Sequence, residues 1–93
     1  MILYLHGFRS SPQSMKAQLM AQAMAERGLA ERFFMPQLPP SPEQAIKECN
    51  EIIAKHRDLN RPLTIIGSSL GGYYATCLAE HHDCRAVVFN PAI

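Results

Sequence analysis

An excess of charge of either sign is missing from this sequence, and so is any long apolar run. Nine Lys and Arg are balanced by eight Asp and Glu, and the basic residues are scattered along the chain, so the sequence predicts no nucleic-acid-binding surface. The amino-terminal stretch MILYLHG is short and has no basic region before it, which argues against a signal peptide or a membrane span. We therefore expect a cytoplasmic protein that does not associate with membranes.

Paired cysteines are also lacking. The three cysteines, Cys49, Cys77 and Cys84, are odd in number and show none of the C-x-x-C spacing of zinc and redox sites. We expect each of them to serve as a small apolar side chain. The sequence thus predicts neither a metal site nor a cofactor.

The chain is short for a globular protein, with 93 residues of which 47% are hydrophobic and 18% charged. Such a chain can bury one core, so we expect residues 1–93 to form a single domain. Apolar runs typical of strands alternate with segments whose apolar residues recur at helical spacing. The expected strands are residues 2–5, 32–38, 63–66 and 86–89, and the expected helices are residues 12–27, 42–56 and 70–82.

The expected strands are continuous apolar runs, which is typical of an α/β protein with a parallel sheet covered by helices on both faces. Pro36 favours an edge position for the second strand, because proline cannot donate to the hydrogen bonds of a central strand. With right-handed crossovers, these features predict a four-stranded sheet of order 2-1-3-4. This order has a topological switch point between strands 1 and 3, because strand 2 is added on one side of strand 1 and strand 3 on the other. Sheets of this kind carry their functional residues at the switch point.

The stretch TIIGSSLGGYYA, residues 64–75, joins the third expected strand to the third helix through the pattern G-x-S-x-G, formed by Gly67, Ser69 and Gly71. In a nucleophile elbow the serine sits on a sharp strand-to-helix turn, where a Cβ on either glycine would collide with the neighbouring strand or helix. The hydroxyl then lies at the carboxyl edge of the sheet, next to the positive end of the following helix. We therefore interpret Ser69 as a candidate nucleophile.

Two other interpretations fit the same residues. Ser68, Ser69 and the glycines can form no more than a tight turn with a helix cap. A phosphate-binding loop is the second alternative, but the lysine of a Walker loop and the spacing of a dinucleotide fingerprint are both missing. The strand before the serine and the helix after it favour the elbow.

A second candidate segment, His6-Gly7-Phe8, ends the first strand beside the elbow strand. At that position a backbone N–H can join the N–H of Leu70 in an oxyanion hole. A His-Gly pair alone is weak evidence for an oxyanion hole. Its expected position next to the elbow is what supports this interpretation.

Three stretches, LYLHGFRSSPQSMKAQLM, IIGSSLGGYYATCLAE and AVVFNPAI, resemble the small bacterial YqiA-type esterases of the α/β-hydrolase superfamily. The resemblance covers essentially the whole chain, as the amino-terminal portion of such a fold. It implies that Ser69 is the acyl-accepting nucleophile and that the backbone N–H groups of Phe8 and Leu70 form the oxyanion hole. It also implies that His6 shapes the turn. Similar proteins are longer, and this chain stops where their remaining strands would begin.

The base that would activate Ser69 is not evident. In hydrolases of this type the acid and the histidine follow the serine, and after Ser69 the sequence offers only the segment EHHD, residues 80–83. A continuous helix puts His81 about 18 Å from Ser69, well beyond hydrogen-bond reach. His6 lies at the catalytic edge and is an alternative base, although a hydrogen-bonded structural role is favoured for it. We expect the acid and the base outside these residues.

These observations predict a serine hydrolase for small carboxylic esters or thioesters that is incomplete in these residues. The strand at residues 86–89 is then expected to be an exposed apolar edge, where a second copy or a complementing carboxy-terminal segment can pair. The alternative from a different class is a non-catalytic α/β interaction module, or pseudo-hydrolase, that self-associates through this strand.

Overall fold

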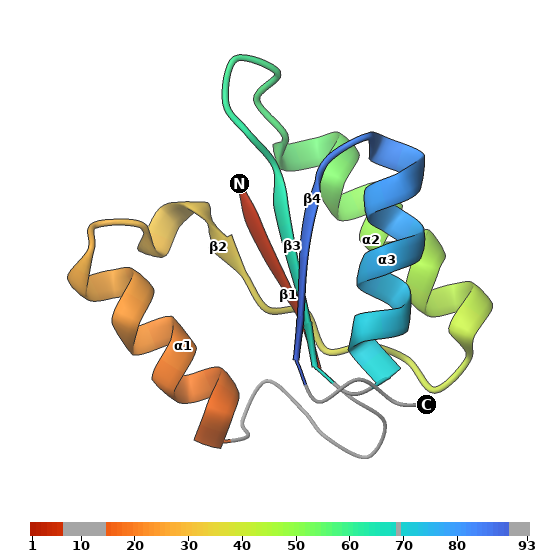
Figure 1. The fold of residues 1–93 in the computed structure, drawn as a ribbon, viewed down its shortest axis with the longest axis horizontal. Helices are drawn as coiled ribbons and strands as arrows, with labels where there is room; N and C mark the ends of the chain where they lie inside the picture. The colour runs from red at the N-terminus through yellow and green to blue at the C-terminus, as the bar shows by residue number, and fades with distance from the viewer. Residues whose placement is uncertain (7–14, 69, 90–93) are drawn as a thin grey trace.

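Strands and helices alternate along the chain in the computed structural model, which describes residues 1–6, 15–68 and 70–89. Figure 1 shows the ribbon, in which a 3-10 turn, η1, precedes the second strand. The bounds are β1 Ile2–Leu5, α1 Met15–Glu26, η1 Ala30–Arg32, β2 Phe33–Phe34, α2 Pro42–His56, β3 Thr64–Ser68, α3 Leu70–His82 and β4 Arg85–Phe89. This succession of strands and helices is the one that the sequence predicts.

The four strands form one parallel sheet in the order β2-β1-β3-β4. In the middle of the sheet, Leu3 pairs with Ile65, and Ile65 pairs with Ala86. The α/β class and the strand order expected from the sequence are thereby confirmed. Because the strands are parallel, their carboxyl ends meet at one edge of the sheet and their amino ends at the other (Figure 1).

Helices cover both faces of the sheet, as expected. Figure 1 shows α1 on one side and α2 with α3 on the other. Successive residues of a strand point to opposite faces. The side chains of Leu3 and Leu5 therefore lie on the face covered by α2 and α3, whereas the side chain of Tyr4 lies on the face covered by α1. Met20 of α1 packs against the smaller cluster around Tyr4.

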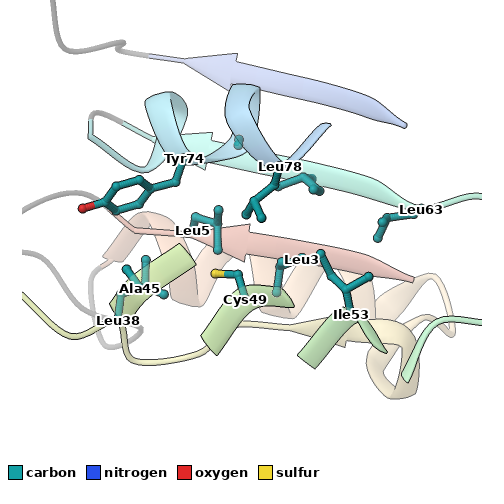
Figure 2. Close-up of a cluster of buried hydrophobic side chains, with 11 residues drawn as sticks. Leu3, Leu5, Leu38, Ala45, Cys49, Ile53, Leu63, Tyr74 and Leu78 are labelled. Atoms are coloured by element: carbon teal, nitrogen blue, oxygen red, sulfur yellow. The ribbon is translucent and has the colours of Figure 1, made fainter. Parts of the chain in front are cut away.

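The larger cluster of buried side chains lies between the sheet and the pair α2 and α3 (Figure 2). Leu3 and Leu5 of β1 are fully buried there, together with Cys49 of α2 and Leu78 of α3. Burial, with a smaller contribution from Glu48, raises the pKa of the Cys49 thiol to about 12. Cys49 therefore stays protonated at neutral pH and acts as the small apolar side chain that the sequence predicts.

The second strand is a correction to the sequence prediction. It was expected over residues 32–38, but β2 covers Phe33–Phe34 alone, and Arg32 belongs to η1. Pro36 lacks the N–H that would continue the ladder with β1, and the N–H of Leu38 donates to the ring of His6 at 2.9 Å instead of to a strand. The edge position predicted from Pro36 is correct, because β2 pairs with β1 at one end of the sheet.

Two helix boundaries follow the capping signals in the sequence. Gly28, two residues after the end of α1, has a φ of +73°, a conformation that favours glycine and ends a helix. At the start of α2, the hydroxyl of Ser41 accepts a hydrogen bond from the N–H of Gln44 at 3.4 Å, with Pro42 in the first helical position. The expected start of α1 at Pro12 lies outside the described residues.

Candidate active site

The predicted nucleophile segment lies at the carboxyl edge of the sheet, where β3 passes into α3. β3 ends at Ser68 and α3 begins at Leu70, so one residue of the chain, Ser69, connects them. Ser69 lies outside the described residues, as do Gly7 and Phe8 of the second candidate segment. The backbone on both sides of Ser69 changes from strand to helix within one residue, which is what a nucleophile elbow requires.

Gly71, in the first turn of α3, lies directly against the end of β1. A Cβ added to Gly71 would be 2.8 Å from the carbonyl oxygen of His6 and 2.7 Å from the carbonyl carbon of Leu5. Both neighbours are backbone atoms, which cannot move aside as the end of a flexible side chain can. Glycine at this position therefore brings the start of α3, including Leu70, next to the carboxyl end of β1.

Gly67 of β3 is crowded by the same helix. A Cβ added to Gly67 would be 2.6 Å from the Cα of Gly72, and one added to Gly72 would be 2.6 Å from the Cγ1 of Val88 in β4. The prediction from the sequence did not include Gly72, although the GG pair was a signal for it. Three glycines thus hold the first turn of α3 against the ends of β1, β3 and β4.

The first turn of α3 can receive a negative charge. The first backbone N–H groups of a helix have no partner within the helix, and the helix dipole makes this end positive. No acidic residue occurs in the first turn of α3, so its own side chains do not neutralise that end. Leu70, whose N–H is the predicted oxyanion donor, is the first residue of this turn.

His6 directly follows β1, lies beside Gly71 and is 7% exposed. Its Nε2 accepts the hydrogen bond from the backbone N–H of Leu38. While that bond is present, the Nε2 lone pair is engaged and does not take a proton from a hydroxyl. The contact favours the structural role of His6 over the alternative that His6 is the base, because it fixes the end of β1 to the chain that follows β2.

Tyr4 contacts the residue before the candidate nucleophile, and its side chain lies on the face of the sheet that α1 covers. Its ring is 2% exposed, and burial raises the pKa of its phenol, while a side-chain hydrogen bond with Ser68 lowers it. Ser68 is the last residue of β3, adjacent in sequence to Ser69. This hydrogen bond ties the residue before the candidate nucleophile to the centre of the smaller cluster.

The ionisable residues that follow Ser69 lie at the other edge of the sheet. His82 ends α3, and its Nε2 is 2.6 Å from the Oδ1 of Asn50 in α2, while its carbonyl accepts a hydrogen bond from Arg57. Burial lowers the pKa of His82, and His81 and Arg57 lower it further. The length of α3 separates this group from Leu70 (Figure 1), in agreement with the separation calculated from the sequence.

Neither a metal centre nor a membrane helix is found in the part of the chain that the structure describes. Over residues 1–6, 15–68 and 70–89, no three His, Cys, Asp or Glu side chains are grouped so that they could hold a metal ion. In the same residues, no helix combines the length and the apolar character needed to span a bilayer.

Comparison with known proteins places related sequences over the whole chain. A model of the family described as "Uncharacterised protein family (UPF0227)" matches residues 1–93. The UPF0227 protein of Citrobacter koseri is 33% identical over 92 residues, which are 98% of this chain and 50% of that relative. The UPF0227 protein YcfP of Salmonella arizonae has the same identity and coverage. The chain thus spans about half the length of the curated relatives that it matches.

Proposed function

We propose that this chain, which belongs to the UPF0227 family, supplies the nucleophile and the oxyanion hole of a serine hydrolase for carboxylic esters or thioesters. In this proposal residues 1–93 are the amino-terminal portion of a YqiA-like α/β-hydrolase that acts in the cytoplasm. Neither a cofactor nor a metal takes part in the reaction.

The observation that carries the proposal is the close contact of α3 with the end of β1. Gly71 has no room for a Cβ because the backbone of Leu5 and His6 lies against it. A tight turn with a helix cap does not need this contact, whereas an oxyanion hole does, because it takes one N–H from the residue after the nucleophile and one from the neighbouring strand end. The contact therefore favours the elbow over the simple turn.

The proposed reaction has two steps. The hydroxyl of Ser69 attacks the ester carbonyl while a base takes its proton, and the oxyanion accepts hydrogen bonds from the backbone N–H groups of Phe8 and Leu70. The alcohol or thiol then leaves with the proton from the base, and an acyl-serine remains. Water, activated by the same base, attacks the acyl-serine and releases the carboxylic acid.

The acid and the base are proposed to come from outside residues 1–93. His6 uses Nε2 as an acceptor for Leu38, and His82 lies at the far end of α3. The matched relatives are longer than this chain by about half of their own length, which leaves room for both groups. A segment of that kind can pair along β4, the edge strand next to β3.

The proposal is tested with a fluorophosphonate, which forms a stable bond to an activated serine and is detected by intact mass. In the full-length protein that carries residues 1–93, we expect one adduct, none after Ser69→Ala, and an adduct of the same mass in Ser68→Ala, which removes the neighbouring hydroxyl and keeps Ser69. Residues 1–93 alone should react roughly 10⁶-fold more slowly, because a triad without its base loses about that much rate.

Two results would contradict the proposal. One is an adduct that persists in Ser69→Ala, which would assign the reactive hydroxyl to another residue. The other is a full-length wild type that takes no label although its circular dichroism shows a folded protein.

A second candidate function is the non-catalytic interaction module, which is favoured by the surface of β4. Val87 and Val88 are 42% and 38% exposed, and within the described residues β4 pairs with β3 on one side only. Exposed apolar edge strands are sites of association between chains. In this alternative two copies pair through β4 and no ester is hydrolysed.

Sedimentation of the wild type and of Val87→Lys tests the alternative. A self-associating module would be dimeric as wild type and monomeric as Val87→Lys, while the control Ala54→Lys, at an exposed position of α2, would remain dimeric. A wild type that sediments as a monomer would exclude self-association through β4.

A further inference from the structure

Three adjoining cavities lie along the amino edge of the sheet, at the opposite end from Leu70 and His6. The first and the third have volumes of about 320 Å³ each, and the one between them has about 230 Å³. The middle cavity shares Arg32 and Arg61 with the first cavity and shares Pro62 and Thr64 with the third. The three cavities together are called the amino-edge groove below.

Arginines from separate parts of the sequence meet in this groove. Arg32 lies just before β2, Arg57 at the end of α2, Arg61 in the loop before β3, and Arg85 is the first residue of β4. Because a parallel sheet brings the amino ends of its strands to one edge, residues that are scattered in the sequence become neighbours. The carboxylates that line the groove are Glu31, Asp58 and Asp83.

The charge around Arg32 is not balanced by these carboxylates. Asp58 pairs with Arg61, at 3.5 Å between Oδ2 and Nε. No carboxylate of the described residues forms an ion pair with Arg32. The pKa of the Met1 ammonium beside it is lowered, first by burial and then by the charge of Arg32, which outweighs the opposite effect of Asp58. An anion between these groups would therefore be stabilised by both.

A second guanidinium has an unused donor. The Nε of Arg57 is buried, and none of the described residues accepts a hydrogen bond from it. Its Nη1 donates to the carbonyl of His82 at 3.4 Å, which fixes the side chain at the third cavity. The guanidinium is thus held at the third cavity by this one hydrogen bond, and its positive charge adds to the potential that an anion in the groove would meet.

The first cavity has an aromatic wall. Phe34 of β2 and His56 of α2 lie with their ring centroids 4.6 Å apart and their planes inclined by 33°. Both line the cavity that also contains Arg32 and Arg61, and His56 is exposed. A planar ring can therefore stack on His56 while a group attached to it reaches the two guanidinium groups.

From these contacts we infer that the amino-edge groove binds a nucleotide with two or more phosphates, its base against His56 and its phosphates along Arg32 and Arg61. Guanidinium groups bind phosphate through paired, charge-assisted hydrogen bonds. Arg57 and Arg85 extend the same positive lining toward β4. The site lies at the other edge of the sheet from the elbow and does not depend on the role of Ser69.

Titration with ADP, followed by calorimetry and by the ring C–H resonances of His56, tests the inference. We expect saturable binding of ADP that shifts these resonances, with weaker binding of pyrophosphate and of adenosine alone. Arg32→Gln and Arg61→Gln should each weaken the binding of ADP roughly 10-fold or more, because each removes a hydrogen bond to a charged group. The control Arg27→Gln, at an exposed position outside the groove, should bind as the wild type does.

Each other outcome would overturn a stated part of the inference. Pyrophosphate that binds as tightly as ADP would overturn the role of the aromatic wall. An equal loss of affinity in Arg27→Gln would reduce the effect to net charge and overturn the site. A wild type that shows no saturable binding of ADP, or no shift of the His56 resonances when bound, would overturn the inference without reference to any variant.

Discussion

The two edges of the sheet are held together by different kinds of contact. At the carboxyl edge, glycines of β3 and α3 lie against backbone, and His6 is buried and hydrogen-bonded. At the amino edge, exposed side chains of arginines, carboxylates and rings surround a groove. Backbone against backbone leaves no alternative arrangement, whereas long exposed side chains can move to admit a ligand. One parallel sheet thus provides a rigid edge suited to positioning reacting groups and an adaptable edge suited to binding charge.

The largest difference in the free energy of unfolding should appear between two glycine-to-alanine variants, one at each edge of the sheet. Gly71→Ala places a Cβ against the backbone of Leu5 and His6, and we expect the free energy of unfolding to fall by about 3 kcal/mol or more. Gly28→Ala meets no atom within 4 Å and should cost only about 1 kcal/mol for its positive φ. Urea denaturation measures both. Equal losses would mean that the carboxyl edge is not the more constrained of the two.

The next largest difference in the free energy of unfolding is expected between His6→Ala at the carboxyl edge and His56→Ala at the amino edge. His6→Ala leaves the buried N–H of Leu38 without its acceptor, so we expect a loss of about 1 to 3 kcal/mol in the free energy of unfolding. His56→Ala removes one exposed ring from its contact with Phe34 and should cost less than about 1 kcal/mol. The same denaturation experiment compares them. A larger loss for His56→Ala would reverse the proposed ranking of the two edges.

The sequence predicts the sheet well because its order depends on local signals. Apolar runs, the alternation with helices and the proline at position 36 determine the class and the order β2-β1-β3-β4. The length of β2 could be predicted only in part, because Pro36 is visible in the sequence but the hydrogen bond that draws Leu38 to His6 joins residues 32 positions apart. The pattern of neighbouring residues in the sequence does not reveal a contact between residues so far apart.

The two candidate sites differ in the same way. The elbow is a contiguous motif, so its residues could be named from the sequence. The arginines of the amino-edge groove are scattered from Arg32 to Arg85, and their number is unremarkable beside eight Asp and Glu. The signal that could have found them is their position at the end of α2 or near the amino ends of successive strands, which has meaning only once the strands are known to be parallel.

The amino edge should also respond to pH through His82. Burial, His81 and Arg57 lower the pKa of His82 in the folded protein below its unfolded value of 6.5. As the pH falls below about 6.5, the unfolded chain therefore takes up the proton first, and the free energy of unfolding decreases until the folded pKa is passed. Denaturation at about pH 7.5 and pH 5 should show this decrease in the wild type and a smaller one in His82→Gln. An identical decrease in both proteins would assign it to other groups.

The smallest expected change in stability is also the sharpest test of what the amino edge is for. Asp58→Asn removes the exposed ion pair with Arg61 but keeps an Oδ1 that can accept the N–H of Asn60, as Asp58 does at 2.9 Å. Exposed pairs contribute little, so the free energy of unfolding should change by less than about 0.5 kcal/mol. Arg61 is then free to bind phosphate, and the affinity for ADP should rise by roughly threefold. If Asp58→Asn loses stability without a gain in affinity for ADP, Asp58 holds the amino edge together. If the affinity for ADP rises at unchanged stability, ligand binding at this edge is separate from the contacts that stabilise the fold.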